Sequence, residues 1–141
     1  MKKEKSCGVI PFCSIGNENR VILIKQNNGV VGFPKGHVEI NETEEETALR
    51  ECKEETNLTP TLIKGFKKEI SYYMPEYDAY KTVAFFIGVV KDISFKKQES
   101  EISDIVVLNI QDALDAISFK DTKSLLKKAY KFFAKMQKTC R

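Results

Sequence analysis

The chain of 141 residues has no tryptophan, one histidine and four prolines, and no apolar run in it approaches the length of a membrane span. With 42% hydrophobic and 30% charged residues, the composition excludes a disordered chain. The length suits one domain, which we expect to cover residues 1–141. We also expect that no signal peptide precedes the first strand and that the chain has no membrane partner.

The four cysteines, Cys7, Cys13, Cys52 and Cys140, show neither a C-x-x-C pair nor a zinc-binding spacing. Cys7 and Cys13 lie six residues apart in an extended segment, about 20 Å along a strand at ~3.3 Å per residue. They could not form a disulfide without a turn between them. We therefore expect a reduced, cytoplasmic protein.

Arginine is scarce, so lysine supplies most of the 23 basic residues, and the formal net charge is only +3. A lysine-rich surface usually serves solubility, which argues against a nucleic acid as partner. A local basic cluster that faces a polyanionic small molecule remains compatible with this composition.

Carboxylates dominate residues 36–58, where they follow a glycine turn at fixed intervals. Glu51, Glu54 and Glu55 are spaced i, i+3, i+4, so a helix places all three on one side. Like charges at this spacing destabilise an isolated helix by a few tenths of a kcal/mol per pair. A hard divalent cation would reverse that effect, because Mg²⁺ is bound by carboxylates and by substrate phosphates. The alternative is a solvated acidic helix face.

The ends of this helix carry their own signals. Thr43 and Glu46 fit a capping box, and Asn57 suits a left-handed C-cap. An apolar stripe lies beside the acids, which is a poor place for charge unless something compensates it. Its members are Ala48, Leu49, Cys52 and Thr56.

This segment resembles the Nudix box, G-x5-E-x7-R-E-U-x-E-E-x-G-U with U aliphatic, which marks hydrolases of nucleoside diphosphates linked to another moiety. Asn57 replaces the last glycine and Cys52 an aliphatic residue, and both replacements are physically mild. The matching positions are Gly36, Glu42, Arg50, Glu51, Glu54, Glu55 and Leu58.

Residues outside the box extend the resemblance. The stretch 33–39 (Phe-Pro-Lys-Gly-His-Val-Glu) is similar to the loop of asymmetrical diadenosine tetraphosphate hydrolases, whereas many other Nudix enzymes have a small residue at the place of His37. The stretches 7–10, 65–72 and 81–83 look like the same group. Val31 stands where a tryptophan is often found.

Hydrophobic patterning predicts strands over residues 6–13, 21–26, 62–74, 81–90 and 105–110, and helices over 43–56 and 121–137. The apolar run 83–90 suits a central strand covered on both faces. The fold class is therefore α/β, and the resemblance implies a Nudix-type α/β/α sandwich with a mixed β-sheet between helices.

The resemblance implies a hydrolase that uses Mg²⁺, or Mn²⁺ in its place, to cleave diadenosine tetraphosphate into ATP and AMP. The expected metal ligands are the Gly36 carbonyl, Glu51, Glu54, Glu55 and Glu101. Glu51, Glu54 and Glu101 are the candidates for the general base. Arg50 completes the catalytic set, because i, i+4 pairs with Glu46 and Glu54 would let it orient the carboxylates.

The polyphosphate chain is expected to meet Lys35, His37 and Lys81, and a nucleobase is expected to stack on Tyr72. Simpler roles remain open, since His37 could brace its loop and Lys81 could be an ordinary surface lysine. Glu99 lies close enough to Glu101 to take its place.

Two other functions also remain open. One is hydrolysis of a different substrate, such as capped or triphosphorylated RNA, a diphosphoinositol phosphate or a damaged nucleotide. The other is a non-catalytic domain that senses nucleotides, although such domains usually lose box glutamates and this chain keeps all of them. We expect a monomer.

Overall fold

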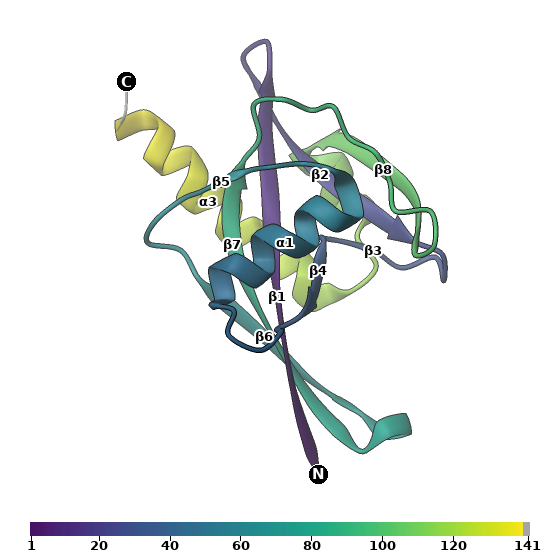
Figure 1. Ribbon diagram of the computed structural model, residues 1–141. Helices are drawn as coiled ribbons and strands as arrows, with labels where there is room; N and C mark the ends of the chain where they lie inside the picture. Colours follow the sequence, from purple (N-terminus) through teal and green to yellow (C-terminus); the bar gives the residue numbers. More distant parts are fainter. Residues whose placement is uncertain (140–141) are drawn as a thin grey trace.

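The computed structural model describes residues 1–139, so Cys140 lies outside the described part of the chain. Eight strands form one sheet with helices on both faces (Figure 1). Strand β1 (Lys2–Ile15) lies at its centre and runs parallel to β7 (Ala79–Val89), whereas its other pairings are antiparallel. This mixed sheet between helices confirms the predicted fold class.

The sheet divides beside β1, and this division positions the functional site. The C-terminal part of β1, Phe12–Ile15, pairs with β2, whereas Ser6–Gly8 pair with the short strand β4. β2 diverges from β1 and pairs along its length with β8 instead. The remaining strands are β2 (Glu18–Gln26), β3 (Val31–Gly32), β4 (Lys35–His37), β5 (Thr61–Leu62), β6 (Lys68–Met74) and β8 (Ile102–Asn109).

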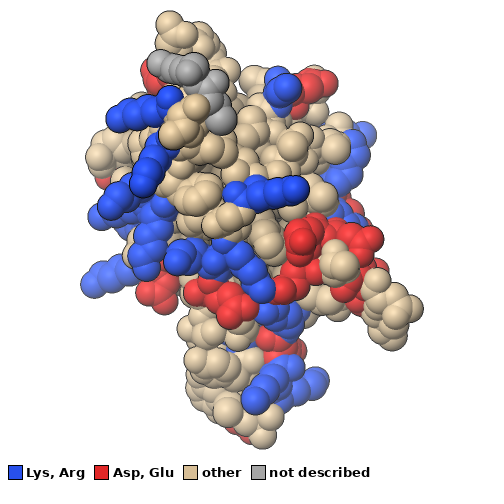
Figure 2. Space-filling model, turned by 90° about the vertical axis from the view of Figure 1, so that its left-hand side faces the viewer, with Lys and Arg blue, Asp and Glu red and all other residues tan. Residues whose placement is uncertain are grey.

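Helix α1 (Glu44–Thr56) begins and ends where its local signals predict. The Thr43 hydroxyl accepts a hydrogen bond from the Glu46 N–H at 3.1 Å, and the Glu46 carboxylate accepts one from the Thr43 N–H at 2.9 Å. Asn57 adopts the left-handed conformation, with φ 66° and ψ 12°. The capping box and the C-cap are therefore confirmed. Figure 2 shows acidic side chains gathered over the start of α1. Negative charges at this end stabilise the helix, because they interact favourably with the positive end of its dipole.

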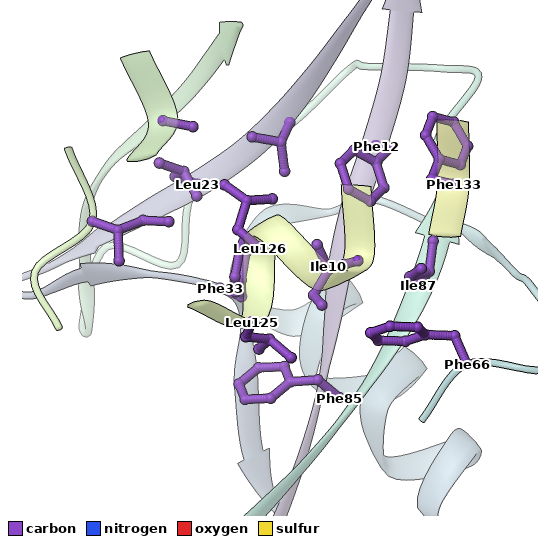
Figure 3. Close-up of a cluster of buried hydrophobic side chains, with 14 of the residues drawn as sticks. Ile10, Phe12, Leu23, Phe33, Phe66, Phe85, Ile87, Leu125, Leu126 and Phe133 are labelled. Carbon is purple, nitrogen blue, oxygen red and sulfur yellow. The ribbon is translucent and has the colours of Figure 1, made fainter. Parts of the chain in front are cut away.

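Two apolar layers cover the sheet. On the side of α3 (Lys120–Thr139), Phe12 stacks on Phe133 with ring centroids 4.6 Å apart (Figure 3). Along β7, Val83, Phe85 and Ile87 join this layer, while Ala84 and Phe86 join the layer under α1. The prediction of a central strand covered on both faces is confirmed.

Three predictions of secondary structure are wrong. The stretch 62–74 is interrupted, because Gly65 at φ 95° turns the chain and separates β5 from β6. A further helix, α2 (Ile110–Ala116), follows β8 directly, because the Asn109 side chain accepts a hydrogen bond from the Asp112 N–H. The first strand extends beyond 6–13, since β7 pairs with it from Lys2 onward.

Three of the four cysteines lie in the described residues. Cys7, Cys13 and Cys52 are buried and free, and burial raises the pKa of each thiol. Among the helices in residues 1–139, none has the length and apolar character that a membrane crossing requires.

Candidate active site

A cleft of about 610 Å³ is lined by β4 and by the residues at the end of β2. Helix α1 forms one wall, and the segment before β8 forms another. Most of the predicted site residues reach it although they come from four separate parts of the chain. The predicted residues that line it are Lys35, Gly36, His37, Glu51, Glu54, Glu55, Lys81 and Glu101.

Glycine at position 36 leaves room beside β4 for the carboxylate of Glu51. A β-carbon at Gly36 would overlap the carboxylate of Glu51, so any other residue type would displace this carboxylate from its present position. The Glu51 carboxylate therefore lies directly against the backbone of β4. Burial raises the pKa of Glu51, although its hydrogen bond with Arg50 acts in the opposite direction.

Glu55 is the most buried of the acids, with 4% of its surface exposed. Its carboxylate accepts a hydrogen bond from the Lys35 N–H at 3.1 Å. The pKa of Glu55 is raised to about 8, mainly by burial and in smaller part by the charges of Glu51 and Glu101. A buried carboxylate with acidic neighbours needs a cation to remain ionised at neutral pH.

The donor set fits a hard divalent cation, because carboxylate oxygens from α1 and from the segment before β8 face the same space. In residues 1–139, no three carboxylate, imidazole or thiol groups converge closely enough to enclose an ion by themselves. An ion bound here would need further oxygen ligands from water or substrate, which Mg²⁺ usually keeps in its coordination sphere.

Arg50 lies behind the carboxylates and does not line the cleft. Its guanidinium donates to Glu42 at 2.6 Å and 3.0 Å, to Glu51 at 2.9 Å and to the His37 carbonyl at 2.9 Å. The predicted pair with Glu54 is present, with donor–acceptor distances of 3.3 Å.

The predicted pair between Arg50 and Glu46 is wrong, because Glu46 is engaged in the capping box at Thr43. Glu42 takes that place. Its hydrogen bonds with the Arg50 guanidinium lower the pKa of Glu42 to about 2, and its bond with the Glu39 N–H acts in the same direction. Arg50 therefore links the loop before α1 to the acids on the helix.

Two lysines also line the cleft. Lys81 is buried, with 9% of its surface exposed, and Lys35 is partly buried beside it. The pKa of Lys35 is lowered to about 8, mainly by burial and next by the neighbouring charge of Lys81. Two close ammonium groups with restricted hydration favour an anionic partner.

His37 lines the cleft, whereas Tyr72 lies outside it. His37 ends β4 with an exposed ring, and its Nε2 is 3.7 Å from the Glu4 carboxylate. Tyr72 does not line the cleft, and 39% of its surface is exposed. It is aligned with Lys81 across β6 and β7, and Glu4 is aligned with Lys81 on the other side. Residues aligned in this way project from the same face of the sheet. Tyr72 is therefore a direct neighbour of Lys81.

Of the two glutamates that could reach the site, Glu101 lines the cleft and Glu99 does not. Asn27 and Asn28, which the sequence patterns did not mark as site residues, also line the cleft. Two asparagines before a glycine indicate a turn, and nothing local shows that the turn faces a site.

Comparison with known proteins adds independent findings. A family model described as the NUDIX domain matches residues 7–130. The chain is 34% identical over 121 residues to the pig (Sus scrofa) bis(5'-nucleosyl)-tetraphosphatase [asymmetrical], covering 82% of this chain and 81% of the relative. The mouse (Mus musculus) protein of the same name is 30% identical over 146 residues, covering 91% and 94%.

Among solved structures, the chain resembles the binary complex of the C. elegans Ap4A hydrolase, with a TM-score of 0.85 and 23% identity. The match covers 93% of this chain and 98% of that one. At this level of identity the likeness shows a common fold.

Proposed function

Because the chain belongs to the Nudix hydrolase family, we propose that it hydrolyses dinucleoside polyphosphates and cleaves diadenosine tetraphosphate into ATP and AMP. One observation carries this proposal: carboxylates (Glu51, Glu54, Glu55 and Glu101, the acidic wall) and lysines (Lys35 and Lys81, the basic wall) line the same cleft. A polyphosphate chain needs both, because cations must neutralise its charge while a water molecule is aligned for attack on phosphorus. The relatives from pig and mouse support the choice of substrate.

The acidic wall is the proposed metal site. Glu51, Glu54, Glu55 and Glu101, with the Gly36 carbonyl, would hold Mg²⁺ or Mn²⁺, which neutralises phosphate charge and lowers the pKa of a bound water. Arg50 orients this group of carboxylates, as its bonds with Glu51 and Glu54 suggest. One of Glu51, Glu54 and Glu101 accepts the proton of the attacking water.

The basic wall is the proposed site for the phosphates. Lys35 and Lys81 bind the polyphosphate chain, and His37 contacts it near the rim of the cleft. Tyr72 flanks these residues and stacks on one nucleobase. With one adenosine held there, the length of the polyphosphate chain sets which phosphorus reaches the carboxylates. Water then attacks the phosphorus nearest the other adenosine, and ATP leaves.

The direct test is incubation of the purified chain with diadenosine tetraphosphate and Mg²⁺, followed by separation of the nucleotides. ATP and AMP in equal amounts are expected. Parallel reactions with capped RNA, triphosphorylated RNA, a diphosphoinositol phosphate and oxidised nucleotides would compare kcat/KM across substrates. A higher kcat/KM for any of these would reject the proposed substrate, and no turnover of any substrate would reject catalysis. The monomeric state and the single domain over residues 1–141 stay predictions.

A further inference from the structure

Asn27 makes three hydrogen bonds to three successive carbonyl groups. Its backbone N–H donates to the Glu101 carbonyl at 2.9 Å. Its side-chain Nδ2 donates to the Ser100 carbonyl at 3.0 Å and, in a longer bond, to the Glu99 carbonyl at 3.5 Å. One residue at the end of β2 therefore holds the whole turn that carries Glu101.

The other end of this turn is attached to α1. The Gln98 N–H donates to the Glu55 carbonyl at 3.1 Å, and the Lys96 N–H donates to the Thr56 carbonyl at 2.8 Å. These carbonyls belong to the last turn of the helix, where no partner within the helix is available. The turn thus bridges the helix that carries Glu55 and the strand that ends beside Asn27.

Pairing between β2 and β8 is irregular at this point. Lys25 is aligned with Asp104 and Gln26 with Ile102, so Ser103 is an extra residue in β8. Bulges of this kind redirect the strand and interrupt the ladder of hydrogen bonds. The position of Glu101 therefore depends on the Gln98 carbonyl, which accepts from its N–H at 3.0 Å, and on Asn27.

We propose that Asn27 is a positioning residue that holds the turn 98–101 and thereby keeps the carboxylate of Glu101 directed at the acids of α1. The inference rests on the proposed function only for the role of Glu101. Loss of the Asn27 side chain removes the bonds to the Glu99 and Ser100 carbonyls and leaves only the backbone bond from Asn27 to the Glu101 carbonyl. Glu101 then occupies a broader range of positions, and a displacement of about 1 Å from a reactive geometry lowers turnover by as much as ~10²-fold.

The first test needs neither substrate nor metal. Amide hydrogen exchange of the metal-free protein, followed by NMR, should show faster exchange at the Glu101 and Ile102 N–H groups in Asn27→Ala. Asn27→Asp keeps the shape of the side chain without its donors and should show the same change. Asn109→Ala is the matched control, because it removes an asparagine that caps α2 away from the cleft. Unchanged exchange at residues 101 and 102 in both Asn27 variants would overturn the inference.

The second test is a double-mutant cycle with Glu101→Gln. Asn27→Ala should lower kcat by about 10- to 100-fold with a small change in KM in the parent chain. In the Glu101→Gln background the same substitution should lower kcat by less than about 2-fold, because a residue that acts through Glu101 has nothing left to position. Additive losses would overturn the assignment. Absence of all activity in the parent chain would reject the proposed function, while the exchange measurement would still decide whether Asn27 holds the turn.

Discussion

The carboxylate of Glu55 and the backbone N–H of Lys35 are joined by a 3.1 Å hydrogen bond inside the protein. This bond attaches α1 to the start of β4 and fixes one acid of the cleft. This bond does not offset the free-energy cost of burying the ionised carboxylate, because the pKa of Glu55 is still raised to about 8.

The free energy of unfolding should therefore depend on the protonation of Glu55 when metal is absent. The folded-state pKa, about 8, lies above the unfolded value of ~4.3, so this group stabilises the fold at low pH. That contribution is lost as the pH rises toward 8. The pKa of Lys35 is lowered to about 8 from an ordinary value near 10.4. Its titration therefore acts above pH 8, where it increases the free energy of unfolding as the pH rises.

Glu55→Gln tests this prediction, because it keeps the acceptor for the Lys35 N–H but cannot ionise. In EDTA, the stability of the natural chain relative to the variant should decrease between pH 5 and pH 8. Urea unfolding at several pH values measures the difference. Parallel pH profiles for the two chains would show that Glu55 is not the titrating group.

Activity should disappear with a chelator and return with Mg²⁺ or Mn²⁺. Glu54→Gln should lower kcat by orders of magnitude while the fold survives, because the substitution removes a ligand charge without a change of volume. Glu45→Gln is a matched control on the exposed side of α1. Near-normal turnover of Glu54→Gln would contradict the assignment of the acidic wall as the metal site.

The position of bond cleavage can be read from an isotope label. Hydrolysis of diadenosine tetraphosphate in ¹⁸O-labelled water should place the label in AMP, because the proposed attack is on the phosphorus next to the free adenosine. Diadenosine pentaphosphate should give ATP and ADP, because the distance from the held adenosine sets which phosphorus is attacked. Mass spectrometry of the products decides between these outcomes and two others, namely label in ATP or formation of two ADP.

Tyr72→Ala should weaken substrate binding more than it slows the chemical step. Stacking on an aromatic ring contributes ~1–3 kcal/mol per base, which corresponds to a KM about 5- to 150-fold higher. Tyr77→Ala is the control, because that ring lies at the exposed tip of the hairpin between β6 and β7. Steady-state kinetics of both variants separate KM from kcat. Equal behaviour of the two variants would remove Tyr72 from the base site.

Replacement of Asn57 should reveal its left-handed conformation. Asn57→Gly should be neutral or slightly stabilising, whereas Asn57→Val should reduce the free energy of unfolding by roughly 1 kcal/mol or more. Both variants lose the long bond from the Asn57 side chain to the Ser94 carbonyl, so their difference isolates the backbone. Thermal unfolding of the two proteins provides the comparison, and equal stability would count against the cap.

Local chemistry alone determined the boundaries of α1. Thr43 and Glu46 cap each other across three residues, and Asn57 needs only its own backbone conformation to end the helix. The same local spacing placed Glu51 and Glu54 on one side of α1. Signals of this kind can be read from the sequence because both partners lie within one turn of the same helix.

Tertiary structure decided the contacts between distant segments. Spacing on the helix suggested Glu46 as a partner for Arg50, but the fold of the preceding loop brings Glu42 to the guanidinium instead. Lys35 and Lys81 become neighbours only because β4 and β7 flank the same stretch of β1. The placement of Glu101 depends on the bulge in β8 and on Asn27. The register between strands follows from the packing of the whole sheet, so no single segment of the sequence encodes it.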